Sequence, residues 1–121
     1  MPKNIAPFQR FEGRYKQGRH VRITADMMHS DAWSALKAHA KMVYLHMKQK
    51  YNGQDEFFRF TYDEAWKTMK LNDQTYKRAK ARLIELGFIS VAENNRHRMR
   101  ANVYRFSSKW QNYKKKKQST I

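Results

Sequence analysis

Two closely spaced helical segments near the middle of the chain constrain its fold most. Residues 61–64, Thr-Tyr-Asp-Glu, match a capping box and predict a helix to about Met69. After a short break, Asn72 is a favourable N-cap for a second helix over Asp73–Leu86. Gly87 then occupies the position at which a left-handed residue ends a helix. The two helices must therefore pack against each other across a tight turn.

Two further helices are predicted before this pair. Ser30 or Asp31 can cap a short helix that ends near Lys37, and residues 24–29 lead into it. Apolar residues at helical spacing then predict a longer helix over His39–Tyr51. The chain therefore has four predicted helices, of which the last two form the close pair.

Three segments have the composition of strands, and they lie at Phe57–Thr61, Phe88–Glu93 and Asn102–Phe106. The last two predict a β-hairpin around the polar, cationic loop 94–100, with Asn94-Asn95 near its turn. The predicted fold class is thus α+β, with four helices, a small antiparallel sheet and a C-terminal hairpin.

The net charge of +16 is unevenly distributed along the chain. Residues 1–22 contain six Lys or Arg and one acid, whereas residues 23–93 contain eleven and nine. Residues 94–121 contain nine Lys or Arg and no acid. Lys and Arg bind polyanions by replacing condensed counterions, so this segregation indicates a nucleic-acid partner. A merely solubilising surface is the alternative, but it gives no reason for the absence of acids from the last segment.

The close pair has the spacing of a helix-turn-helix, in which the first helix braces the second against a DNA groove. At 100° per residue, one stripe of the second helix is apolar and should be buried; it contains Tyr76, Ala79, Leu83 and Leu86. The opposite side contains Gln74, Lys77, Arg78, Ala81 and Glu85. Gln can pair with adenine, and Arg or Lys with guanine. Asn72 and Thr75 stand at the helix start, where free N–H groups favour an anion.

The hairpin loop Arg96-His97-Arg98-Met99-Arg100 is the second element expected to contact DNA. Arginines on a loop suit phosphate contact or insertion into a narrow minor groove. A plain surface turn is the alternative, for which mixed charges would be expected. The full set of predicted DNA-binding residues is Tyr62, Asn72, Gln74, Thr75, Lys77, Arg78, Arg82, Arg96, His97, Arg98 and Arg100.

Five segments together resemble winged helix-turn-helix domains; they are residues 30–33 (Ser-Asp-Ala-Trp), 40–45 (Ala-Lys-Met-Val-Tyr-Leu), Gly53, 72–79 (Asn-Asp-Gln-Thr-Tyr-Lys-Arg-Ala) and 86–89 (Leu-Gly-Phe-Ile). The chain is most similar to such domains in phage and plasmid replication initiators, replisome organisers and small DNA-binding proteins of Gram-positive mobile elements. The resemblance covers residues 24–107, between a basic arm (1–23) and a basic tail (108–121). It implies a recognition helix at 73–86 and a wing at 94–101.

The resemblance implies binding to double-stranded DNA as a monomer or weak dimer. A full replication initiator carries a second domain, for which this chain has no room, so an accessory or regulatory factor of a plasmid or mobile element is expected. Its role would be conjugative transfer or repression, with other proteins of a transfer or replication complex as further partners. A replication initiator or replisome organiser module is the alternative.

An RNA-binding protein is the rival from another class, because small basic proteins with lysine tails are common there. RNA readers stack unpaired bases on exposed aromatic residues, whereas the aromatic residues here mostly sit at core-spaced positions. Trp110 and Tyr113 are expected to anchor the tail on the domain, with dimerisation through them as the alternative.

An enzyme is not expected, and neither is a metal or a cofactor. The chain has no cysteine, its five histidines lack ligand spacing, and capping explains Asp63 and Glu64 without a metal. No apolar run approaches the length of a membrane span or a signal peptide, so a cytoplasmic protein is expected.

Overall fold

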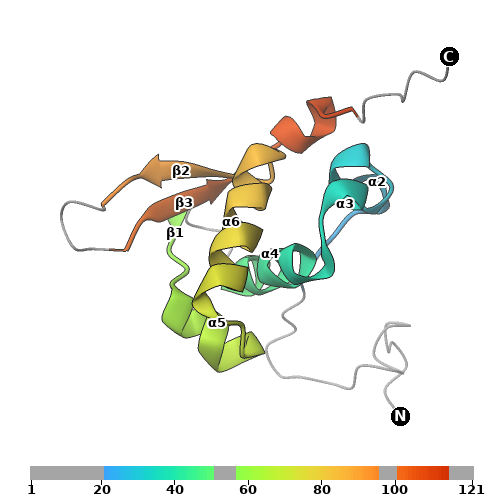
Figure 1. Cartoon of the computed structure of the whole chain (residues 1–121). Helices are drawn as coiled ribbons and strands as arrows, with labels where there is room; N and C mark the ends of the chain where they lie inside the picture. The colour runs from blue at the N-terminus through green and yellow to red at the C-terminus, as the bar shows by residue number, and fades with distance from the viewer. Residues whose placement is uncertain (1–20, 51–56, 96–100, 115–121) are drawn as a thin grey trace, which may run out of the picture.

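The computed structural model describes residues 21–50, 57–95 and 101–114, and these form an α+β structure (Figure 1). In chain order the elements are α2 (Ala25–Met28), α3 (Asp31–Ala35), α4 (Ala38–Lys50), β1 (Phe57–Phe58), α5 (Tyr62–Met69), α6 (Asp73–Glu85), β2 (Ile89–Glu93), β3 (Val103–Phe106) and the 3-10 helix η2 (Lys109–Asn112). The β2–β3 hairpin and the α2–α3 pair lie on opposite sides of α6 (Figure 1).

The described residues contain five α-helices, so the prediction of four was wrong by one. The additional helix is α2, a single turn where the sequence predicted only an approach to the first helix. The Thr24 side chain accepts a hydrogen bond from the Met27 amide at 3.2 Å, and Met27 is the buried residue of that turn. A single turn with one buried residue has no apolar periodicity, which explains why the pattern did not reveal it.

The three strands form one antiparallel sheet in the order β1-β3-β2. Phe58 pairs with Tyr104, and Ile89 pairs with Phe106, so the predicted pairing of the last two strands is confirmed. The register shifts between Val91 and Glu93. Strand β1 has only two residues, shorter than the predicted Phe57–Thr61.

The core lies between α4, α6 and the sheet, and its centre is aromatic. The rings of Tyr44 and Phe88 meet edge to face, with 5.4 Å between their centroids. The ring of Tyr44 also meets that of Phe106, with 5.7 Å between the centroids. Trp110, from η2, stacks on Phe88 at 6.1 Å with the two planes 4° apart. Trp110 and Tyr113 both pack against the core, as predicted for the start of the tail.

Gly87 ends α6 in a Schellman motif, as the sequence predicted for a left-handed residue. Its φ is +88°, its N–H donates to the Ile84 carbonyl at 3.2 Å, and the Phe88 N–H donates to the Leu83 carbonyl at 2.9 Å. A Cβ at this position would lie 2.7 Å from backbone atoms of Lys109 and Trp110. The glycine thus both reverses the chain and lets η2 approach.

We predict that Gly87→Ala lowers the free energy of unfolding by about 3 kcal/mol, because left-handed backbone costs about 1–2 kcal/mol and overpacking costs about 1–3 kcal/mol. Urea denaturation followed by tryptophan fluorescence measures this change. Ala81→Gly, an ordinary exchange between the same residue types in exposed α6, should cost only about 1 kcal/mol. A Gly87→Ala variant as stable as the Ala81→Gly variant would contradict the close approach.

Candidate nucleic-acid interface

Helix α6 buries and exposes the sides that its sequence predicted. Tyr76, Ala79 and Leu83 are buried in the core. Leu86, at the C-cap, is also buried. The exposed positions are Gln74, Lys77, Arg78, Ala81 and Glu85. The buried stripe therefore determines which side chains α6 presents to solvent.

The start of α6 is fixed by its own cap. The Asn72 side-chain oxygen accepts a hydrogen bond from the Thr75 amide at 2.8 Å, so this oxygen is already engaged within the helix. Thr75 is half-buried rather than fully exposed. Lys70 precedes the cap with a φ of +56°, which turns the chain between α5 and α6 at the predicted break.

Acidic side chains accompany two of the cations of α6. Lys77 pairs with Asp73 at 3.0 Å between Nζ and Oδ2, and Arg82 pairs with Glu85 at 2.9 Å. Arg78 makes no ion pair with any residue in the described parts of the chain. Among the described cations predicted to contact DNA, Arg78 is thus the one whose charge is not offset by an adjacent carboxylate.

Two concave surfaces flank the exposed side of α6. The first, which we call the α4–α6 cavity, has a volume of 460 Å³ and is lined by Ala35, Lys37, His39, Ala40, Thr75, Arg78, Ala79 and Arg82. The second, the α6–hairpin groove, has a volume of 670 Å³ and is lined by Phe60, Thr61, Tyr62, Tyr76, Lys77, Lys80, Asn94, Ala101, Asn102 and Tyr104. The structure thereby divides the predicted residues Tyr62, Thr75, Lys77, Arg78 and Arg82 between two surfaces.

Three cationic or titratable side chains of these surfaces were not predicted. Lys80 lines the α6–hairpin groove, and its Nζ atom lies 5.2 Å from the ring centroid of Tyr76 and 5.7 Å from that of Tyr104. Lys37 and His39 line the α4–α6 cavity. The helical period of α6 could have placed Lys80 on the flank of its exposed side. Nothing in the sequence pattern places Lys37 or His39 beside α6, because they belong to a different helix or its approach.

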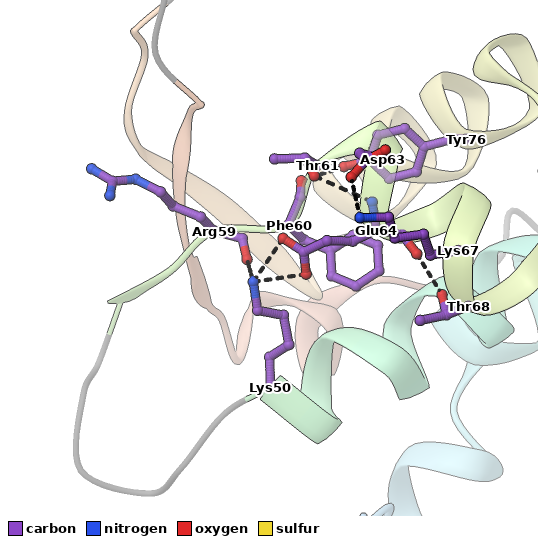
Figure 2. Close-up of polar contacts among 9 residues, drawn as sticks. All are labelled: Lys50, Arg59, Phe60, Thr61, Asp63, Glu64, Lys67, Thr68 and Tyr76. Carbon is purple, nitrogen blue, oxygen red and sulfur yellow. Dashed lines mark hydrogen bonds and ion pairs between the residues drawn. The ribbon is translucent and has the colours of Figure 1, made fainter.

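A polar cluster positions α5, the helix before the turn (Figure 2). The Thr61 side chain accepts a hydrogen bond from the Glu64 amide at 3.3 Å, as the capping box predicted. The Glu64 carboxylate instead binds Lys50 of α4 at 2.8 Å, so the reciprocal half of the box is replaced by a tertiary ion pair (Figure 2). Lys50 also donates to the Arg59 carbonyl. These contacts tie the end of α4 to the start of α5.

A buried hydrogen bond joins α6 to the same turn. The Tyr76 hydroxyl donates to the Phe60 carbonyl at 2.6 Å. Burial raises the pKa of Tyr76, and the nearby Tyr104 and Glu64 add to the rise. The phenol is thus held in its neutral, donating form, and its hydrogen bond ties α6 to the segment between β1 and α5.

The base of the hairpin is held by asparagines. Asn95 is 1% exposed; its N–H donates to the Asn102 side chain at 2.8 Å, and its side-chain amide donates to the Ala101 carbonyl at 3.0 Å. The predicted wing residues Arg96, His97, Arg98 and Arg100 lie outside the described residues, as does most of the basic arm. The structure therefore fixes where the cationic loop leaves and rejoins the sheet.

The described residues provide neither a metal-binding cluster nor a membrane-spanning helix. Residues 21–50, 57–95 and 101–114 contain no group of three or more His, Cys, Asp or Glu that could hold a metal ion. In the same part of the chain, no helix has both the length and the apolar character to span a membrane.

We predict that Tyr76→Phe lowers the free energy of unfolding at neutral pH by about 1–2 kcal/mol, because the buried Phe60 carbonyl is left without its donor. Tyr62→Phe, at an exposed tyrosine, should change it by less than about 0.5 kcal/mol. Urea titrations measure both effects. Equal stability of the two variants would contradict the buried bond.

The same substitution should change the alkaline dependence of stability. The unfolded tyrosine loses its proton near pH 10 while folded Tyr76 retains it, so wild-type stability should fall as the pH rises above about 10. Tyr76→Phe removes this contribution and should flatten the fall, whereas Tyr44, whose pKa burial also raises, still contributes. An unchanged slope between about pH 9 and 11 would contradict the assignment.

We compared the chain with known proteins in three ways. Neither a scan of protein-family models nor searches of curated proteins and of solved structures finds a match to the chain.

Proposed function

We propose that this protein binds double-stranded DNA in a sequence-specific manner through a winged helix-turn-helix, with α6 as the recognition helix. The observation that carries the proposal is the exposed side of α6, where Gln74, Lys77 and Arg78 surround the small Ala81. Cation-lined concave surfaces flank this side on both edges. A helix in the major groove lies between two phosphate backbones, so base-reading groups between two cationic flanks suit that position.

The arrangement of elements supports the winged helix-turn-helix. Helices α5 and α6 are joined through Lys70 and Leu71 and the cap Asn72, the short connection typical of a helix-turn-helix. An antiparallel hairpin follows α6 directly and projects away from the helices (Figure 1). The loop 96–100 at the end of this hairpin is the proposed wing, and its three arginines suit phosphate or minor-groove contact.

The exposed side chains of α6 suggest a division of roles. Gln74 can donate and accept with one adenine edge, and Arg78 can donate twice to guanine. Ala81 lets the helix axis approach the base edges. Tyr62, Lys77 and Lys80 line the α6–hairpin groove, where their donors face one backbone. The choice of base would then depend on Gln74 and Arg78, and the affinity for the DNA backbone on the cations of the concave surfaces beside α6.

The resemblance to mobile-element proteins supports a role as an accessory or regulatory factor of a plasmid or mobile element, in conjugative transfer or repression, in the cytoplasm. A replication initiator module is the alternative within the same class. We propose binding as a monomer or weak dimer, with other proteins of a transfer or replication complex as further partners.

RNA binding is the second candidate, and one observation favours it. Tyr62 and Trp66 on α5 are 40% and 46% exposed, although the sequence placed most aromatic residues in the core. Exposed aromatic rings can stack unpaired bases. The ring of Trp66 is accompanied by the Lys70 amine at 5.2 Å, an arrangement that also occurs on ordinary surfaces.

The test begins with selection of a preferred duplex from a random library by the full chain. We predict that Arg78→Ala weakens binding to the selected duplex by about 1–3 kcal/mol, or roughly 5–150-fold, with little change on a scrambled duplex. Fluorescence anisotropy gives both dissociation constants. Arg59→Ala is the matched control, since its side chain points away from α6 (Figure 2) and should not affect discrimination.

Two outcomes would contradict this proposal. Equal weakening on selected and scrambled duplexes would exclude base reading by Arg78. Tighter binding to a single strand or RNA hairpin of the selected sequence, abolished in Trp66→Ala, would favour RNA recognition.

The basic tail generates a separate prediction. Replacing Lys114, Lys115, Lys116 and Lys117 by Gln should weaken binding to every duplex alike and reduce the slope of log K against log salt by about 0.9 for each phosphate that the tail no longer neutralises. Removal of the uncharged residues 118–121 is the control and should leave the slope unchanged. An unaltered slope in the Gln variant would show that the tail lysines do not bind DNA.

A further inference from the structure

The α4–α6 cavity has an unusual set of charges on its walls. One wall comes from the start of α4 and the residues before it and contributes Lys37 and His39; the other comes from α6 and contributes Arg78 and Arg82. Among the described residues, no carboxylate lines the cavity. Three cations and one histidine, from α6, from α4 and from the residue before α4, thus line one hollow.

Carboxylates engage some of the described cations, whereas others, such as Lys48, Lys70 and Lys80, lie over aromatic rings. Lys50, Lys67 and Lys77 each lie within 3.0 Å of a carboxylate. Of the cavity's cations, only Arg82 has such a partner within the described parts of the chain, and this is Glu85, whose side chain is 66% exposed. An exposed pair of this kind contributes at most about 1 kcal/mol, so a bound anion can displace it. The mutual repulsion of the cavity cations gives no stability by itself, which points to a ligand of opposite charge.

The remaining lining residues provide space and one hydroxyl group. Ala35, Ala40 and Ala79 are small, and Thr75 of α6 is the lining residue that carries a hydroxyl group. The volume of 460 Å³ falls in the range of roughly 300–1,000 Å³ found for small-molecule sites. The cavity can therefore admit a group larger than a single water-sized ion.

The donors favour phosphate over other anions. Guanidinium groups bind phosphate oxygens in a bidentate manner, and lysine adds a point charge. A carboxylate has two oxygens in one plane, whereas the oxygens of a phosphate are arranged tetrahedrally, with two non-bridging oxygens in a backbone diester and three in a terminal phosphate. A phosphate can therefore be approached by donors from both walls. Lys37 lines one wall and Arg82 the other, so each wall offers a cation to such a group.

We propose that the α4–α6 cavity is a phosphate-binding site, with Lys37 and Arg82 as its principal ligands and Thr75 and His39 beside them. Arg78 also lines the cavity, but the proposed function assigns its side chain to base contact, so it is not counted among the phosphate ligands. The site goes beyond the proposed function, because it does not require α6 to read bases. The phosphate could belong to the backbone of bound DNA or to a free phosphorylated molecule, and the experiment separates these sources.

The probe is inorganic pyrophosphate, titrated into the full chain at constant ionic strength maintained with sodium chloride. We expect saturable shifts of backbone amide resonances confined to residues 35–40 and 75–82. The double variant Lys37→Ala/Arg82→Ala should weaken this binding at least tenfold. Arg59→Ala/Lys67→Ala removes the same charge outside the cavity and should bind pyrophosphate as the wild type does; circular dichroism confirms that both variants fold.

Non-saturable shifts, shifts spread over all basic surfaces, or equal weakening in the two double variants would overturn the site. The source is identified by repeating the titration on protein saturated with the selected duplex. Abolished pyrophosphate binding assigns the site to a backbone phosphate, whereas retained binding assigns it to a free phosphorylated ligand. Should the chain select no duplex, salmon-sperm DNA replaces it in this arm.

The two proposals can fail separately. Selective DNA binding without saturable pyrophosphate binding overturns the cavity alone. Saturable pyrophosphate binding in a chain that shows no preference among duplexes overturns the proposed function alone.

Discussion

The packing of α6 against α4 is the interaction on which the rest of the structure depends. Ala40, Val43 and Tyr44 of α4 are buried, as are Ala79 and Leu83 of α6. An amphipathic helix that buries one stripe has no freedom in what it exposes, because rotation about its axis would bring Lys77 or Arg78 into the core at a large desolvation cost. The buried stripe of α6 thus determines the orientation of its exposed side.

Local and tertiary signals determine different parts of this arrangement. The ends of α5 and α6 could be predicted because Thr61, Asn72 and Gly87 act over three or four residues of their own chain segment. The buried stripe of α6 followed from its period. By contrast, Glu64 fulfils only half of its predicted capping role, since Lys50 of another helix provides a charged partner that a pattern over four residues does not contain.

The same distinction explains what sequence reasoning missed at the site. Gln74, Lys77 and Arg78 could be assigned to one exposed side from helical geometry alone. The α4–α6 cavity could not, because it depends on where Lys37 lies relative to Arg82 once two helices have packed. Its existence also depends on small residues: Ala40 and Ala79 are buried at the helix contact and line the cavity, so they leave room beside it that larger side chains would fill.

The near-neutral charge of residues 23–93 has to be considered together with the ion pairs that the structure shows in this region. Residues 23–93 are close to neutral by count, which alone would assign polyanion binding to the flanks. Yet the acids of α5 and α6 are engaged with Lys50, Lys67, Lys77 and Arg82. Arg78 and Lys37 lie outside these pairs and face the same cavity. A nearly neutral segment can therefore present a local positive surface, because neutrality summed over a chain says nothing about which charges meet in space.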